Sequence, residues 1–414
     1  MYSIVLISYL IITIQNTLSI DILEQDFQLP IEKLLLVNQH LYFGTVNSLH
    51  RLSSRTFNRT SSTLHFPSTY HWKILTSINN EQLLLCGTLS QGICQLVDRD
   101  LNLIINSSIP VVANDPQNST IGLIIPEKNL VYFGVTYTND GAYRWQIPSI
   151  AGRSLNSTRF MKILSANDDD GITRDDLSLR FMSRQQTTFI VQYIYSFSTK
   201  YYIYFLTNQP NDLGERIYLT KLVRFCRQSS NSILRTYTEI PLICSSSEWI
   251  LQTADFIRNE NNDEILIGHF TRKDGSRGTT VCSWNVKNDI DKALEENYRR
   301  CYSMGIGQRG LAFIKPNEPC RKDESWSIPN NEENLCPFID NDRLPYPVGG
   351  IQPVVGRLIY ENLIESSSTF QTHSIGSLRV IFQGLTNGTL KLVSEEIACR
   401  YVVFLSLALH LLCF

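Results

Sequence analysis

The glycine-rich residues 305–310 are the first candidate for chemistry in this chain. They read GIGQRG, which matches by letter the fingerprint that holds the pyrophosphate of a dinucleotide. That fingerprint works only when a strand leads into it and a helix follows, because the helix N-terminus binds the phosphates. Here Cys301 lies just before the segment, and residues 311–316 favour a strand and then a turn. We therefore interpret the segment as a glycine-rich loop and predict that the protein binds no cofactor.

An acidic cluster at residues 167–171 is the second candidate. It reads NDDDG and is similar to a calcium-binding loop. Counting back from Gly171, however, the first ligand position would be Ala166, and the twelfth would be Leu177 in place of glutamate. We expect a solvated acidic loop and no metal site. Its three aspartates are our candidate contacts for a protein ligand: Asp168, Asp169 and Asp170.

Sequence patterns typical of catalysis are absent from the rest of the chain. The seven histidines form no His-x-x-x-His pair with a glutamate, and neither Cys-x-x-Cys nor Gly-x-Ser-x-Gly occurs. The formal net charge of −2 offers no basic surface for DNA or RNA. We predict that the protein is not an enzyme and binds no nucleic acid. A carbohydrate-active propeller enzyme is an alternative, and it would need carboxylates that converge on a central channel.

The N-terminus and the glycosylation motifs predict a secreted or cell-surface protein. Residues 4–14 are almost wholly apolar, and residues 17–19 (TLS) supply small side chains for cleavage before Ile20, so residues 1–19 are predicted to be a signal peptide. In an oxidising compartment the ten cysteines pair by default. Five Asn-x-Ser/Thr motifs predict N-glycosylation, at Asn58, Asn106, Asn118, Asn156 and Asn387.

The C-terminal residues 401–414 form a second apolar run. As a helix this run would be about 21 Å long, which is short of the roughly 30 Å hydrocarbon core of a bilayer. It is the stub of a membrane segment, a removable anchor signal or the product of a truncated reading frame, and we favour truncation. We assign residues 394–414 to a divergent apolar tail, so that contact with a membrane would come only through this tail or through missing segments.

A recurring strand pattern predicts an all-β fold. Short apolar or aromatic runs end in a small residue, and a turn with another strand often adjoins them; examples are residues 41–46 (LYFGTV), 83–88 (LLLCGT), 130–135 (LVYFGV) and 265–270 (ILIGHF). A continuous apolar run needs cover on both faces, which radial stacking of small sheets provides. A β-propeller is therefore predicted, with a two-sheet sandwich as the alternative. The one clear helical segment is residues 288–298, which we interpret as an insertion.

The cysteines supply a framework that sequence alone resolves only in part. Cys86 and Cys94 bracket a glycine-containing turn, and two strands joined by it would bring them within bonding distance. Six more lie further along the chain: Cys226, Cys244, Cys282, Cys301, Cys320 and Cys336. Six cysteines allow 15 connectivities, and spacing does not choose among them.

These segments together resemble the sema domain of plexins. The resemblance rests on residues 41–49 (LYFGTVNSL), 86–96 (CGTLSQGICQL), 220–226 (TKLVRFC) and 281–284 (VCSW), and on the order of the cysteines; it covers roughly residues 34–393. It implies a sema-type seven-bladed propeller over residues 20–393, with the last blade incomplete. It also implies four disulfide bonds: Cys86–Cys94, Cys226–Cys336, Cys244–Cys282 and Cys301–Cys320.

The resemblance also implies a function. Plexin sema domains bind semaphorins, so the expected partners are semaphorin ectodomains and, in addition, other plexin chains. We expect this chain to be the semaphorin-binding extracellular part of a plexin-like receptor, located on the extracellular face of the plasma membrane, or secreted if this is the complete product. The alternative is a secreted semaphorin-like ligand or a soluble decoy.

Overall fold

The computed structural model describes most of the chain between residues 31 and 403. The described residues are 31–53, 59–66, 69–138, 140–141, 147–164, 177–227, 232–259, 262–323, 334–339, 347–350, 352–364, 367–375, 378–385, 390–394 and 401–403. The predicted signal peptide, Asn58, Asp168, Asp169, Asp170 and Asn387 lie outside them. The chain divides into an N-terminal unit, Met1–Leu164, and a C-terminal unit, Ser165–Phe414.

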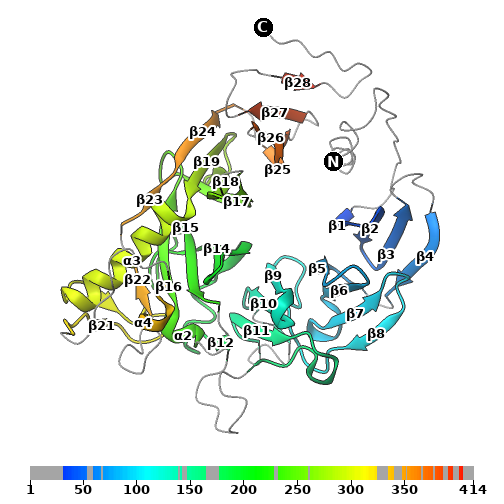
Figure 1. The fold of residues 1–414 in the computed structure, drawn as a ribbon, viewed down its shortest axis with the longest axis horizontal. Coiled ribbons are helices and arrows are strands. Elements are labelled where there is room, and N and C mark those ends of the chain that lie inside the picture. The colour runs from blue at the N-terminus through cyan, green and yellow to red at the C-terminus, as the bar shows by residue number, and fades with distance from the viewer. Residues whose placement is uncertain are drawn as a thin grey trace. The chain divides into compact units, whose positions relative to one another are not determined.

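The N-terminal unit is built from antiparallel sheets whose strands follow one another in sequence (Figure 1). The first sheet contains β1 (Ile31–Val37), β2 (His40–Thr45), β3 (Ser48–Ser53) and β4 (Arg59–His65). The second contains β5 (Trp72–Ser77), β6 (Gln82–Gly87), β7 (Cys94–Asp98) and β8 (Leu103–Asn106). The third contains β9 (Thr120–Ile125), β10 (Leu130–Val135) and β11 (Ile150–Ser154). Short 3-10 turns η2 (Leu89–Gln91), η3 (Pro126–Lys128) and η5 (Ser157–Arg159) join some of these strands.

Tight turns fix the register of these sheets. Between β1 and β2, Asn38 and Gln39 have φ angles of 47° and 67°, the left-handed pair that a two-residue hairpin requires. The turn places Val37 opposite His40, and the same register continues to Leu34 opposite Phe43. Because side chains alternate between the two faces of a strand, this register decides which of them face the neighbouring sheet.

Small residues at the ends of the second strands allow neighbouring sheets to pack closely. A Cβ at Gly44 in β2 would lie 2.6 Å from the Trp72 ring at the start of β5, and one at Gly87 in β6 would lie 2.2 Å from the Tyr70 ring. The Trp72 Nε1 donates a hydrogen bond of 2.8 Å to the Thr45 carbonyl. Since the first strands also contact one another in series, β1 with β5 and β5 with β9, the sheets stack through their inner strands. This explains why the strand pattern in the sequence ends in a small residue.

The C-terminal unit repeats this arrangement. One sheet is formed by β13 (Gln192–Ser198), β14 (Tyr202–Pro210), β15 (Tyr218–Cys226) and β16 (Thr238–Ile243). The next is formed by β17 (Trp249–Arg258), β18 (Glu264–Arg272), β19 (Thr279–Asn285) and β24 (Arg357–Asn362). The last is formed by β25 (Ser367–Ile375), β26 (Leu378–Leu385), β27 (Leu390–Ser394) and β28 (Tyr401–Val403). β13 contacts β17, and β17 contacts β25, so these sheets also stack through their first strands. A two-sheet sandwich does not have this serial stacking.

Short elements complete the C-terminal unit. They are β12 (Ser178–Leu179), α2 (Ile233–Thr236), η6 (Val286–Asp291), α3 (Lys292–Tyr298), η7 (Arg299–Ser303), β20 (Gln308–Arg309), β21 (Glu318–Pro319), α4 (Cys336–Ile339), β22 (Val348–Gly349) and β23 (Val354–Val355). The predicted helix at residues 288–298 is confirmed, and helical structure extends beyond both of its ends. β28 lies within residues 394–414, which the sequence analysis assigns to a tail, and pairs with β27. The number of blades and the boundary at residue 393 stay predictions.

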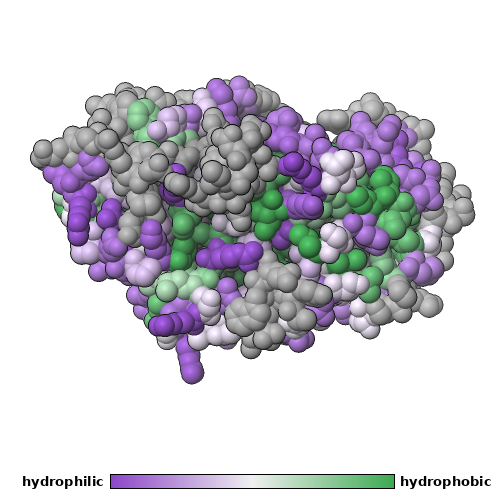
Figure 2. Space-filling view, turned by 90° about the horizontal axis from the view of Figure 1, so that it is seen from below, coloured by the Kyte–Doolittle hydropathy of each residue, from purple (hydrophilic) through white to green (hydrophobic). Residues whose placement is uncertain are grey.

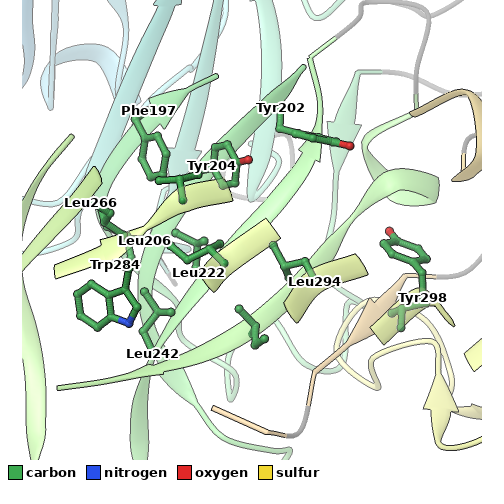
Figure 3. Packing of buried hydrophobic residues seen from close by; sticks show 14 of the residues in the cluster. Phe197, Tyr202, Tyr204, Leu206, Leu222, Leu242, Leu266, Trp284, Leu294 and Tyr298 are labelled. Carbon is green, nitrogen blue, oxygen red and sulfur yellow. The ribbon is translucent and has the colours of Figure 1, made fainter. Parts of the chain in front are cut away.

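The core of the C-terminal unit is a continuous cluster of aromatic and aliphatic side chains. Figure 3 shows Phe197 and Tyr204 beside Leu206 and Leu222, with Trp284 on a neighbouring sheet. The rings of Phe197 and Tyr204 stack with their centroids 4.5 Å apart. Leu294 and Tyr298 of α3 belong to the same cluster, so the inserted helix is part of the core rather than an appendage.

The structure contains the four disulfide bonds that the plexin resemblance implies. Cys86 and Cys94 face each other in the β6–β7 register, with their Cα atoms 4.1 Å apart. Cys226–Cys336, Cys244–Cys282 and Cys301–Cys320 are also formed. The Cys244–Cys282 bond joins the residue that follows β16 to β19 and therefore connects two neighbouring sheets. Cys399 and Cys413 lie outside the described residues.

A buried histidine makes the stability of the C-terminal unit sensitive to acid. His269 of β18 is 1% exposed, and its Nε2 shares a 2.6 Å hydrogen bond with Thr279 Oγ1. Burial lowers the pKa of His269 from 6.5 to about 4. The unfolded chain therefore binds a proton at this residue between those pH values and the folded chain does not, so stability is lost as pH falls from about 6.5 to about 4.

We expect His269→Gln to reduce this acid sensitivity. A shift of this size corresponds to at most about 3 kcal/mol between the two ends of that pH range. The measurement is the free energy of unfolding by denaturant from pH 7 to pH 4, with His65→Gln, at an exposed position, as the control. An unchanged pH slope in His269→Gln would rule out this residue as the source.

Candidate binding surface

The candidate binding surface in the C-terminal unit is formed by an insertion between β19 and β24. It starts at η6, where the Asn285 side chain accepts a hydrogen bond from the Asn288 N–H and caps the first turn. Ile290, Leu294 and Tyr298 follow at intervals of four residues and are buried. This spacing places them on one face, which packs the helix against the core.

The chain returns from this insertion alongside β16. β22 pairs in parallel with the beginning of β16, and β23 pairs in parallel with its end. The outer strand of the β13–β16 sheet is therefore paired with the insertion at both of its ends and is not a free edge. In addition, the Trp284 Nε1 donates a 3.2 Å hydrogen bond to the Val354 carbonyl, which ties the returning segment to β19.

A buried ion pair anchors the insertion to the sheet beneath it. Arg224 of β15 donates from Nη1 to Asp291 Oδ1 at 2.8 Å, and the Tyr204 hydroxyl donates to the same oxygen at 2.8 Å. The Arg224 side chain is 1% exposed, and its guanidinium lies over the Tyr202 ring, 4.1 Å from the centroid. Burial raises the pKa of Asp291, and Arg224 opposes that shift. Removing Asp291 would leave the Arg224 charge buried without its ion-pair partner, and removing Arg224 would leave a half-buried carboxylate without its own.

Further contacts hold both ends of the insertion. The Tyr298 hydroxyl donates to the Thr236 carbonyl at 3.2 Å, and the Leu335 N–H donates to the Tyr202 hydroxyl at 2.7 Å. The disulfide bond Cys226–Cys336 ties the later part of the insertion to the end of β15. These contacts hold the described parts of the insertion against the sheet.

A cavity of about 630 Å³ lies between the insertion and the β13–β16 sheet. Its most buried charged lining residues are Lys221 of β15 and Glu239 of β16, which form an ion pair of 2.7 Å. Glu239 also accepts hydrogen bonds from Gln209 at 3.0 Å and from Tyr237 at 2.9 Å. Burial and the nearby Glu239 raise the pKa of Tyr237 well above its usual value, so Tyr237 remains a neutral donor. Three donors engage this carboxylate, which is the arrangement of a structural group rather than of a general base.

The glycine-rich residues 305–310 form one wall of the cavity. Gly305, Gly307 and Gly310 all have positive φ, and a Cβ at Gly310 would lie 2.3 Å from the Pro316 carbonyl oxygen. Strand β20 falls inside the segment, and no helix follows it directly. The segment is therefore a glycine-rich loop that lacks the strand-to-helix setting of the dinucleotide fingerprint, and its physical role is a tight backbone path closed by Cys301–Cys320.

The surface around this loop is mixed in character. Met304 and Ile306 are 55% and 51% exposed, and Glu296 and Arg300 line the cavity beside them. Figure 2 likewise shows hydrophobic patches interleaved with hydrophilic residues on one face of the molecule. Within the described ranges, no cluster of three His, Cys, Asp or Glu side chains could hold a metal ion. In the same ranges, no helix combines the length and apolar character needed to cross a bilayer.

The predicted ligand contacts and glycosylation sites are only partly visible. Asp168, Asp169 and Asp170 fall outside the described residues and stay a prediction. Of the five glycosylation motifs, three fall within the described chain: Asn106, Asn118 and Asn156. Asn106 and Asn156 are exposed, whereas Asn118 is half-buried. Whether any of them carries a glycan stays a prediction.

Sequence reasoning missed the anchor and the buried pair beside the cavity. Lys221 and Arg224 stand in an otherwise apolar strand, which is a signal that both need buried partners. Those partners are Glu239 and Asp291, which lie 18 and 67 residues further along the chain. Only the fold could bring these groups together.

Comparison with known proteins shows that the chain is similar to plexins. Plexin-2 of Caenorhabditis elegans is 27% identical over 263 residues, which cover 62% of this chain and 13% of that protein. Human Plexin-A4 is 23% identical over 424 residues, which cover 86% of this chain and 21% of that protein. The chain thus spans about a fifth or less of the length of these curated relatives. No family model matches it.

Solved structures agree on the fold. The full extracellular region of Plexin A4 matches with a TM-score of 0.72 at 21% identity, over 88% of this chain and 45% of that one. A chain in the structure of Drosophila Plexin A in complex with Semaphorin 1b matches with a TM-score of 0.55 at 11% identity, over 90% and 76% of the two chains. These likenesses show the all-β sema propeller. The chain is therefore similar in sequence to plexins and has the fold of the plexin extracellular region that it matches.

Proposed function

We propose that this domain is the semaphorin-binding head of a plexin-like receptor, exposed on the outside of the cell. The observation that carries the proposal is the sequence likeness to plexins over most of the chain. It is supported by the match to a structure in which Plexin A is in complex with Semaphorin 1b. The domain acts by protein recognition and catalyses no reaction, as expected from its plexin relatives. The direct test is saturable binding of the secreted chain to a semaphorin ectodomain.

The insertion offers a suitable part of the binding surface. Protein interfaces combine apolar anchors with a polar rim, and a standard-sized interface buries about 800 Å² on each partner. Exposed Met304 and Ile306 supply anchors, and Arg300 supplies a charge at the rim. The buried anchor through Asp291 preorganises this surface, which lowers the entropic cost of binding.

We expect Ile306→Asp to weaken semaphorin binding at least tenfold, because it places a charge at the centre of an apolar contact; tenfold corresponds to about 1.4 kcal/mol. The matched control is Ile364→Asp, which introduces the same charge at a 76% exposed isoleucine of the same unit. The measurement is the Kd by surface plasmon resonance. Equal effects of the two substitutions would move the binding surface away from the insertion.

The acidic cluster is the other proposed contact. Charge reversal at Asp168, Asp169 and Asp170 should slow association with a basic ligand surface, most strongly at low salt. An association rate that is unchanged at low salt would remove the cluster from the proposal.

A secreted semaphorin-like ligand or a soluble decoy is the second candidate. It is favoured by the match to the complex that contains Semaphorin 1b, although identity there is only 11%. Sequencing the transcript beyond codon 414 separates the alternatives, because a membrane helix followed by a cytoplasmic domain would establish a receptor.

A further inference from the structure

Strand β8 leaves an apolar edge at the outside of the second sheet of the N-terminal unit. It is the last strand in the order β5–β6–β7–β8, and in the described part of the chain it pairs only with β7 (Figure 1). Leu103 and Ile104 of β8 are 52% and 46% exposed. Residues 101–106 read LNLIIN, with no charged residue and no proline. Exposed edges of this composition are templates for pairing with another chain.

A glycosylation motif stands at the end of this strand. Asn106 is the last residue of β8, and Ser108 completes the Asn-x-Ser motif. The Asn106 side chain is exposed, and its Oδ1 accepts a 2.8 Å hydrogen bond from Gln95 Nε2 on β7. This contact uses Oδ1 and does not involve Nδ2, the amide atom that would carry the glycan.

The residue after Asn106 fixes its direction. Ser107 is buried, and its hydroxyl accepts from the Cys94 N–H at 3.0 Å and donates to the Ile109 carbonyl at 3.0 Å. With Ser107 held inward, Asn106 faces solvent. The register between β7 and β8 shifts at Ile104, so that Asn106 lies opposite Gln95 and Leu103 lies opposite Val97. Gln95 and Val97 are two residues apart on β7 and share a face, which places Asn106 on the same side of the sheet as the exposed Leu103.

We propose that an N-linked glycan on Asn106 covers the edge of β8 and prevents association between copies of this domain through that edge. An oligosaccharide is transferred from a lipid-linked pyrophosphate donor. The sugar C1–O bond to the pyrophosphate breaks, a C1–N bond to Asn106 Nδ2 forms, Nδ2 loses one proton, and the lipid pyrophosphate leaves. The proposal requires the secretory route that the proposed function also requires, but it does not require semaphorin binding.

The other two glycosylation motifs in the described part of the chain, at Asn118 and Asn156, do not stand at the end of an exposed apolar strand. Asn118 is half-buried, and its backbone carbonyl accepts a 2.5 Å hydrogen bond from Lys73 Nζ. Asn156 is exposed, but its Oδ1 caps a turn through the Thr158 N–H. Among the described residues, no exposed large hydrophobic residue lies between Ile104 and Ile217 in the sequence. Asn156 is therefore the matched control for Asn106.

The test uses the full chain secreted from eukaryotic cells. Peptide mapping before and after enzymatic removal of N-glycans should show that Asn106 is occupied. Size-exclusion chromatography with light scattering should then show a monomer. Removing glycans from the folded wild-type protein, or introducing Ser108→Ala, should raise the oligomeric fraction several-fold, while Asn156→Gln should leave it unchanged.

A rescue variant separates edge association from a folding defect. Ile104→Lys added to Ser108→Ala should restore the monomer, because a charged residue on an edge strand blocks pairing. An unoccupied Asn106 would overturn the proposal. So would a deglycosylated protein that stays monomeric, or a double variant that stays oligomeric. A failure to bind semaphorins would overturn the proposed function and leave each of these readouts intact.

Discussion

Replacing Arg224 with methionine is expected to destabilise the C-terminal unit by about 3 kcal/mol, because Asp291, whose side chain is only 24% exposed, loses its ion-pair partner. Asp291 would keep only the hydrogen bond from Tyr204, at 2.8 Å. The loss of stability should appear first in the insertion, because Asp291 is the last residue of η6, the element with which the insertion begins. The measurement is the free energy of unfolding from denaturant titration followed by circular dichroism.

Two further variants define the cause. Arg224→Met combined with Asp291→Leu removes both charges and should recover much of the loss, since an apolar pair of similar volume is often as stable as a buried ion pair. Arg258→Met breaks a more exposed pair with Glu264, at 2.9 Å, and should cost at most about 1 kcal/mol. Equal losses from Arg224→Met and Arg258→Met would contradict a buried anchor.

Removing the Cys226–Cys336 bond, by changing both cysteines to alanine, is expected to have a comparable effect. The bond closes a loop with a sequence separation of 110 residues. In the chain-entropy model a loop of this length contributes about 4.8 kcal/mol, because the bond restricts the unfolded chain. Unfolding by denaturant without reductant measures the loss.

The Cys86–Cys94 bond provides the comparison. Its separation is 8 residues, for which the same model gives about 2.5 kcal/mol. The alanine pair at these positions should therefore be the milder variant. If it were the more damaging one, local packing around the cysteines, and not loop closure, would control the contribution of these bonds.

Many of the strands and the inserted helix can be predicted from local sequence patterns. Runs such as residues 83–88 begin with apolar side chains and have a glycine near their end, because a side chain at Gly87 would collide with the Tyr70 ring. The inserted helix was equally visible, because Ile290, Leu294 and Tyr298 repeat at a helical spacing and are all buried. The disulfide pairing came from a family resemblance, since spacing alone leaves 15 arrangements open.

The candidate binding surface could not be predicted in the same way. The cavity depends on the pairing of β22 and β23 with β16, which joins segments about a hundred residues apart. The partners of Lys221 and Arg224 are likewise set by tertiary packing and not by local spacing. The sequence could show only that two cations stand in an apolar strand and need compensation.

The most direct test of the central claim is binding of the secreted chain to a panel of purified semaphorin ectodomains. Non-reducing peptide mapping on the same sample should confirm the four disulfide bonds as a control for folding. We predict saturable binding to one or a few semaphorins, and weaker binding by Ile306→Asp. A chain with all four bonds intact that binds no semaphorin would contradict the proposed receptor function.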